Sequence, residues 1–118
     1  MVTTREIDWL AGLFEGEGCA DWMKKERSMR LRIQMTDRDV VERAASIWDT
    51  RVCGPYIRKK RPKSLPMWTA TVHGKKAVFW GLVLLGLMGE RRTAKITELL
   101  MKSKEKEYAS KVPCACSH

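Results

Sequence analysis

The stretch LAGLFEGEG, residues 10–18, decides the fold. Its apolar residues, together with those just before it, recur at helical spacing, and the glycine at its end is a common helix stop. We therefore expect a helix over residues 6–17. Thr3 and Glu6 have the Thr-x-x-Glu spacing of a capping box, which marks the start of this helix.

The predicted helix has two features that are unfavourable by themselves. It ends on Glu15 and Glu17, although the C-terminal end of a helix carries partial negative charge and disfavours a carboxylate by roughly 0.3–1 kcal/mol. It also contains Gly12 and Gly16, and a glycine inside a helix costs about 1 kcal/mol relative to alanine. Close approach of another backbone is one reason for the glycines, and the carboxylates require a separate explanation.

The rest of the chain alternates pairs of strands with helices. We expect strands over residues 19–25 and 28–36, a helix over 36–49 that Thr36 can cap, strands over 53–61 and 66–73, and helices over 74–88 and 90–103. The segment from residue 78 to 87 is most simply core. This order predicts an α+β fold with a four-stranded antiparallel sheet and helices on one face.

Length and charge limit the possible functions. The 118 residues suit one domain, which we place at residues 1–103, followed by a flexible tail over 104–118. Lys and Arg number 23 against 14 Asp and Glu, a formal charge of +9. Nucleic acid is the leading partner for such a charge, an anionic membrane surface is second, and solubility alone is a third explanation. The charged start and the glycine-broken apolar run at residues 77–88 predict a cytoplasmic protein with no membrane segment.

One face of the predicted sheet is polar and basic. Residues 28–36 alternate, so that Met29, Leu31 and Ile33 face inward and their neighbours face outward. Ile57 is expected to face inward on the third strand. A strand-built positive surface can lie along a nucleic-acid groove, where Arg and Gln read base edges. The side chains expected to contact DNA are Cys19, Asp21, Met23, Lys25, Arg30, Arg32, Gln34, Tyr56, Arg58, Lys60, Met67, Thr69 and Thr71.

The motif helix resembles the signature of the LAGLIDADG homing endonucleases. Phe14 stands for the Ile of that signature, Gly16 for its Ala, and Glu15 and Glu17 for its two Asp. The predicted element order matches the αββαββα core of the family across roughly residues 5–102. The segments QMTDRD, residues 34–39, and ERRTAKI, residues 90–96, are also similar to family sequences.

The resemblance implies a metal site at the end of the first helix. In the family, two motif helices pack together and place their last acidic residues, here Glu17, at the centre of a DNA-binding saddle. These carboxylates and the adjoining Gly16 would hold Mg²⁺, with Mn²⁺ able to substitute and Ca²⁺ binding without supporting cleavage. A divalent cation reverses the unfavourable charge at the helix ends. Glu15 would then be a helix-end group or a group that supports the metal ligands, and not the main metal ligand.

The resemblance also implies a homodimer, because the chain has only one complete motif. A second stretch, LLGLMGERR at residues 84–92, has Gly89 and Arg91 at the two acidic positions, so it is not a second copy. The expected dimer interface consists of Leu10, Ala11, Gly12, Leu13, Phe14 and Gly16.

The expected catalytic residues are those that the resemblance places around the attacked phosphate. They are Glu17, Gln34, Asp37 and Arg91, with Arg92 or Lys95 as further sources of positive charge and no assigned general base.

Three functions remain open from the sequence. The first is a metal-dependent, site-specific endonuclease that hydrolyses double-stranded DNA at a long pseudo-palindromic site and acts on no small molecule. The second is a relative that has lost cleavage and serves as an intron maturase or a DNA-binding regulator. The third is a basic α+β scaffold. Glu17 favours the first function over the second, and the basic sheet face disfavours the third.

Overall fold

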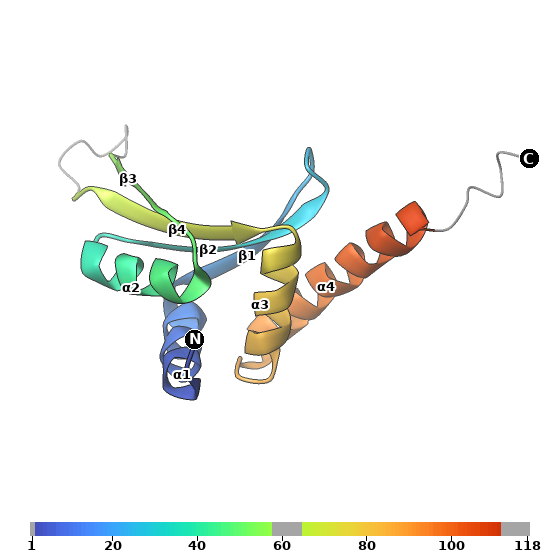
Figure 1. Cartoon of the computed structure of the whole chain (residues 1–118), viewed down its shortest axis with the longest axis horizontal. Coiled ribbons are helices and arrows are strands. Elements are labelled where there is room, and N and C mark those ends of the chain that lie inside the picture. Colours follow the sequence, from blue (N-terminus) through green and yellow to red (C-terminus); the bar gives the residue numbers. More distant parts are fainter. Residues whose placement is uncertain (1, 58–64, 112–118) are drawn as a thin grey trace, which may run out of the picture.

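The computed structural model describes residues 2–57 and 65–111. Its elements, in chain order, are α1 (Thr4–Glu17), β1 (Gly18–Met23), β2 (Ser28–Met35), α2 (Arg38–Trp48), β3 (Val52–Tyr56), β4 (Met67–His73), α3 (Lys75–Leu85) and α4 (Glu90–Lys111) (Figure 1). The predicted α+β order is confirmed.

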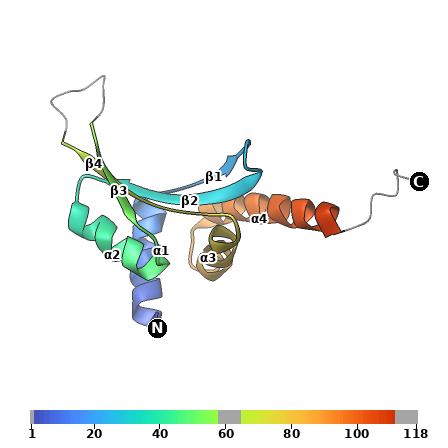
Figure 2. The same cartoon turned by 45° about the horizontal axis from the view of Figure 1, so that its top comes forward.

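The four strands form one antiparallel sheet in the order β1-β2-β4-β3. The helices lie beneath one face of this curved sheet, and the other face is open (Figures 1 and 2). The predicted saddle with helices on one side is therefore confirmed. None of the helices in the described part of the chain is both long and apolar enough to span a bilayer.

The start and end of α1 follow from its sequence. The predicted capping box is present: the Thr3 hydroxyl accepts from the Glu6 N–H at 3.1 Å, and the Glu6 carboxylate accepts from the Thr3 N–H at 3.0 Å. The Thr3 N–H and the Thr3 hydroxyl both donate to the Glu6 carboxylate, and these two hydrogen bonds lower the pKa of Glu6. Gly18 ends the helix with extended dihedrals, φ −78° and ψ 159°, and a Cβ there would lie 2.3 Å from the Phe14 ring. A glycine is required at this position for space, not for a left-handed conformation.

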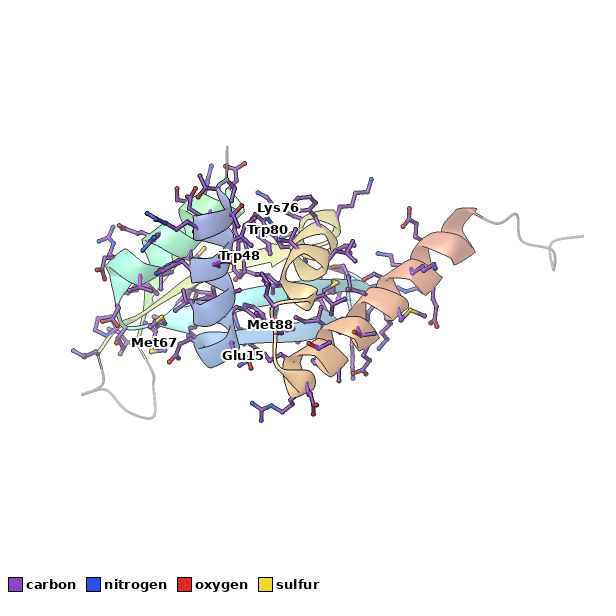
Figure 3. All side chains as sticks on the ribbon, turned by 90° about the horizontal axis from the view of Figure 1, so that it is seen from below. Glu15, Trp48, Met67, Lys76, Trp80 and Met88 are labelled. Carbon is purple, nitrogen blue, oxygen red and sulfur yellow. The ribbon has the colours of Figure 1, made fainter. Side chains whose placement is uncertain are left out.

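The core lies between the helices and the covered face of the sheet. Phe14 of α1 and Trp48 of α2 are fully buried, with ring centroids 6.2 Å apart in an edge-to-face arrangement. Figure 3, seen from the helix side, shows Trp48 and Trp80 among the helices. The inward strand residues Met29, Leu31 and Ile33 are buried as the alternation predicted. α1 is therefore fixed to the sheet through one apolar stripe.

Some predicted boundaries are wrong at helix ends. α2 begins at Arg38, and its N-cap is Asp37, which makes no side-chain capping bond, so Thr36 is not the cap. α3 ends at Leu85, and α4 continues to Lys111, beyond residue 103. Helical periodicity continues across such ends, so it locates them poorly.

Two burial predictions are also wrong. Ile57, expected to face inward, is 62 % exposed, because β3 ends one residue earlier, at Tyr56. Phe79, Leu82 and Leu87, expected in the core, are exposed. Phe79 and Leu82 lie on the side of α3 that has no cover among the described residues, and Leu87 lies in the turn after α3. An apolar run does not reveal which of its sides has a neighbour.

The core position of Phe14 gives a prediction with a matched control. Phe14→Ala removes a fully buried ring and leaves a cavity, so we expect the free energy of unfolding to fall by about 3–5 kcal/mol. Phe79→Ala removes the same group from a side chain that is 59 % exposed, and we expect a change within about 0.5 kcal/mol. Urea unfolding followed by tryptophan fluorescence measures both, and equal losses would contradict this description of the core.

Candidate nucleic-acid interface and metal site

The strand register arranges the outward side chains in rows across the open face. From β1 toward β3, the rows are Met23 with Ser28; Asp21 with Arg30 and His73; Cys19 with Arg32 and Thr71; Gln34 with Thr69 and Cys53; and Met67 with Tyr56. These residues alternate with the buried strand residues, so they lie on the face opposite the helices. Polar and small side chains therefore occupy the middle of an open surface.

Most of the side chains predicted to contact DNA are in these rows. Lys25 lies in the turn after β1 and is exposed, whereas Thr69 is only 9 % exposed. Arg58 and Lys60 lie outside the described residues. The sequence prediction omitted Ser28, Cys53 and His73, of which His73 follows Thr69 and Thr71 in the outward alternation and was therefore detectable.

The open face contains an ion pair between the edge strand β1 and its neighbour β2. Arg30 of β2 donates from Nε to Asp21 Oδ1 at 2.8 Å and from Nη2 to Asp21 Oδ2 at 2.5 Å. The hydrogen bonds from Arg30 lower the pKa of the Asp21 carboxyl, and the same contact raises the pKa of the guanidinium. Arg32, in the next row, forms no ion pair or hydrogen bond with side chains of the described residues. The side chain of Arg30 is therefore held by a neighbouring carboxylate, whereas that of Arg32 is not.

The C-terminal end of α1 is closed by groups from α4 and the turn before it. Arg92 donates from Nε to the Glu15 carbonyl at 3.2 Å and from Nη1 to the Gly18 carbonyl, and its guanidinium lies 5.5 Å from the centre of the Phe14 ring. The Glu15 carboxylate accepts from the Gly89 N–H at 3.1 Å. Figure 3 shows Glu15 beside the turn that contains Met88, the residue before this glycine. Glu15 is thus a helix-end group with a structural partner.

Glu17 has the opposite environment. It is exposed and has no hydrogen-bond or ion-pair partner among the residues that the structure describes. Gly18 pairs with Ile33, so Glu17 and Gln34 occupy neighbouring positions at the same end of the β1–β2 pair. The nearby Gly16 carbonyl accepts no hydrogen bond from the described backbone outside the helix. A carboxylate and a carbonyl oxygen are ligands that Mg²⁺ accepts, so this donor set fits that ion.

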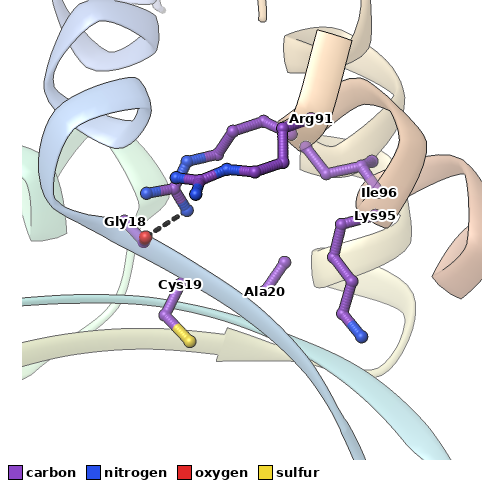
Figure 4. Close-up of a pocket in the computed structure, with 7 residues that line it drawn as sticks. Gly18, Cys19, Ala20, Arg91, Lys95 and Ile96 are labelled. Carbon is purple, nitrogen blue, oxygen red and sulfur yellow. Dashed lines mark hydrogen bonds between the residues drawn. The ribbon is translucent and has the colours of Figure 1, made fainter. Parts of the chain in front are cut away.

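A basic pocket adjoins the end of α1. It has a volume of about 310 Å³ and is lined by Gly18, Cys19, Ala20, Arg91, Arg92, Lys95 and Ile96 (Figure 4). Arg91, predicted to be catalytic, contributes to its wall together with Arg92 and Lys95. Three cationic side chains around one open pocket make it suited to an anion such as a phosphate.

The predicted catalytic residues fall into separate groups. Arg91 lines the pocket, Glu17 directly precedes the pocket residue Gly18, and Gln34 is the neighbour of Glu17 at the same end of the β1–β2 pair. Asp37 is apart from them, at the N-terminal end of α2. No cluster of three His, Cys, Asp or Glu side chains able to hold a metal ion occurs within residues 2–57 and 65–107. The structure therefore brings Glu17 and Gln34 together at the end of α1, beside the basic pocket, but not all four predicted groups.

The predicted dimer interface is only partly available on the surface of α1. Leu10, Ala11 and Phe14 are buried in the core of their own chain, so their side chains are not on the surface that a second chain could contact. Gly12 and Gly16 are exposed, and a Cβ added at either would meet no atom within 4 Å. No close contact with the described residues therefore accounts for the glycines. Leu13, half-buried, is the remaining predicted interface residue.

The contacts of Arg92 predict that its replacement destabilises the protein more than replacement of the adjacent Arg91. Arg92→Met removes the donors to the Glu15 and Gly18 carbonyls, and we expect the free energy of unfolding to fall by about 1.5–3 kcal/mol. Arg91→Met, at an exposed position, should change it by less than about 0.5 kcal/mol. Chemical denaturation measures the free energy of unfolding of both variants, and equal values would show that Arg92 does not hold the helix end.

Comparisons with known proteins agree with this architecture. A family model described as a LAGLIDADG-like domain matches residues 6–79, whereas a search of curated proteins finds no match. The structure is similar to homing endonuclease I-CvuI in complex with its target in the presence of Ca, with a TM-score of 0.68 and 18 % identity over 90 % of this chain and 70 % of that chain. I-CvuI in complex with the I-CreI target in the presence of Mg, with the DNA not cleaved, gives a TM-score of 0.61 and 20 % identity over 85 % and 66 %. The structural matches establish the fold, and because the family model covers more than half of the chain, the protein belongs to the LAGLIDADG-like domain family.

Proposed function

We propose that the protein is a homodimeric, metal-dependent endonuclease that cuts double-stranded DNA at a specific site. The observation that carries this proposal is the position of Glu17. Its carboxylate is exposed and unpartnered at the end of α1, beside a basic pocket and at one end of the open sheet face. An acidic group at a negative helix end gains from a bound cation, and the adjoining arginines and lysine can hold a phosphate beside that cation.

Three observations support DNA as the partner. The chain carries a formal charge of +9, and its open face presents Arg, Gln, Thr and Ser side chains in rows. Related structures of the same fold are complexes with DNA targets. In the proposed complex, Lys and Arg contacts to phosphates provide most of the affinity, and the rows on the sheet read base edges.

The pocket and the end of α1 have complementary roles in this proposal. Arg91 and Lys95 position a backbone phosphate, and Arg92 keeps the helix end in place beside it. Glu17 and the Gly16 carbonyl are the ligands for Mg²⁺, for which Mn²⁺ can substitute. When bound, the metal would activate a water and neutralise charge on the attacked phosphate.

A dimer supplies what a single chain lacks. Cutting a duplex requires two strand scissions, and each chain contributes a Glu17 with the basic pocket beside it. A twofold dimer provides both sites from one gene and predicts a pseudo-palindromic target. The exposed side of α1 with Gly12, Leu13 and Gly16 is the proposed contact, because its glycines permit two backbones to approach closely.

The role of Glu17 is tested by separating binding from cutting. Binding sites are selected from a random duplex pool in Ca²⁺ and then incubated with Mg²⁺. Glu17→Gln should retain binding within a few-fold but cut at least about a thousandfold more slowly, since it removes a charged metal ligand. Glu105→Gln, which removes an exposed carboxylate from α4, should cut normally. Specific binding without cutting by the wild type in any divalent ion would instead favour a cleavage-deficient binder.

Gly12 provides a test of the dimer, because a larger side chain at this position has opposite effects on a monomer and on a dimer that packs through α1. A larger side chain has space in the single chain and improves helix propensity, so Gly12→Leu should stabilise a monomeric protein by up to about 1 kcal/mol. In the proposed dimer the same side chain separates the two helices. We therefore expect Gly12→Leu to sediment as a monomer and Ser46→Leu, at an exposed position in α2, to remain dimeric. A stabilised variant with wild-type sedimentation would rule out this interface.

A further inference from the structure

The ion pair between Asp21 and Arg30 on the open face has a geometry that suits base recognition. We propose that Asp21 holds Arg30 in a fixed orientation in which Arg30 reads a guanine in the major groove of the target. This inference rests on the proposed DNA-binding function and assigns one element of its specificity. Asp21 is a positioning residue, and Arg30 is the group that touches the base.

The hydrogen bonds within the pair determine which edge of Arg30 remains free. Asp21 occupies the Nε and Nη2 side of the guanidinium with its two carboxylate oxygens, at 2.8 and 2.5 Å. A guanidinium has five N–H donors. The end formed by Nη1 and the second hydrogen of Nη2 is therefore still available. This end presents two parallel donors, directed away from Asp21.

Two parallel donors select one base over the others. The major-groove edge of guanine offers two adjacent acceptors, O6 and N7, whereas adenine offers one acceptor and one donor. Arg30 can therefore form a bidentate pair with guanine and not with adenine. Its position supports this role: Arg30 lies in β2, flanked by β1 and β4, in the row with Asp21 and His73. Its side chain is 30 % exposed, so it is accessible but held.

Affinity for DNA alone does not explain why the open face has a carboxylate at Asp21. A carboxylate on a surface that meets phosphates weakens non-specific attraction, and it cancels the charge of the arginine beside it. Stability is also a weak reason, because a partly exposed ion pair contributes at most about 1 kcal/mol and the backbone already pairs β1 with β2. What the carboxylate does provide is orientation, since it restricts a long side chain to one geometry before DNA binds.

Site selection with three variants tests the proposal. Sites are selected from a random duplex pool in Ca²⁺ by the wild type, Arg30→Lys, Asp21→Asn and Arg32→Lys. The wild type should enrich a guanine at one position of each half-site. Arg30→Lys, whose ammonium is not a planar fork, should lose that preference by roughly tenfold or more and keep the preferences at other positions. Arg32→Lys, the matched control from the next row, should keep the guanine at that position.

Asp21→Asn distinguishes a role of Asp21 in orienting Arg30 from a role in stabilising the sheet alone. The amide keeps one acceptor and loses the charge, so the guanine preference should fall several-fold. Non-specific affinity should rise at the same time, with a steeper dependence on salt, because one negative charge has been removed from the DNA-binding face.

The outcomes separate this inference from the proposed function. An unchanged base preference at every position in Arg30→Lys, or a uniform loss at all positions in Asp21→Asn, would overturn the inference alone. A wild type that selects no sequence would overturn the proposed function and this inference together. Thermal unfolding of each variant identifies any loss caused by misfolding, and in that case Arg30→Gln, which keeps a planar group with fewer donors, replaces Arg30→Lys in the same comparison.

Discussion

The arrangement of both candidate functional surfaces depends on how Arg92 closes the end of α1. A helix end exposes carbonyl groups, and cations stabilise this end. The last turn of α1 has no basic residue of its own, and Arg92 supplies the cation from α4 through the Glu15 and Gly18 carbonyls. The same guanidinium lies over the Phe14 ring, so a single side chain connects the helix end, the core and the start of β1.

This closure gives the two acidic residues of the motif different roles. Successive helical residues are about 100° apart, so Glu15 and Glu17 point about 200° from each other. Glu15 points toward the turn before α4 and accepts from the Gly89 N–H, which fixes that turn to α1. Glu17 is left exposed, with no structural partner among the described residues. Because Arg92 and Glu15 secure the helix end, the Glu17 carboxylate is available for a ligand.

The sequence was sufficient where the determining contacts are local and insufficient where they are not. The capping box of Thr3 with Glu6 and the alternation of β2 depend on residues close in sequence, and both were predicted correctly. The contacts of Arg92 join residues more than 70 positions apart, so no local pattern indicated which basic residue would close α1. The exposure of Phe79 was missed for a related reason, since periodicity identifies an apolar side but not its neighbour.

The site was predictable in composition but not in arrangement. Alternation assigned Asp21 and Arg30 to the open face, yet only the register of β1 against β2 shows that they are direct partners. The register of β2 against β4 likewise places His73 in the same row. Conversely, burial removed Leu10 and Phe14 from the predicted dimer interface, because a helix of this small domain must use one side for its own core.

The distribution of charge over the sheet indicates how affinity and specificity are divided in the proposed complex. In the described rows the basic residues are the two arginines of β2, and one of them is compensated by Asp21. Much of the positive charge lies in the connections instead: residues 24–27 contain Lys24, Lys25 and Arg27, and the sequence RKKRPKS at residues 58–64 adds five basic residues between β3 and β4. Phosphate contacts need charge but not a fixed orientation, whereas base contacts need orientation more than charge. A sheet with few charged side chains and basic connections meets both requirements, because a compensated arginine on the sheet adds little non-specific attraction and retains the donors that distinguish one base from another.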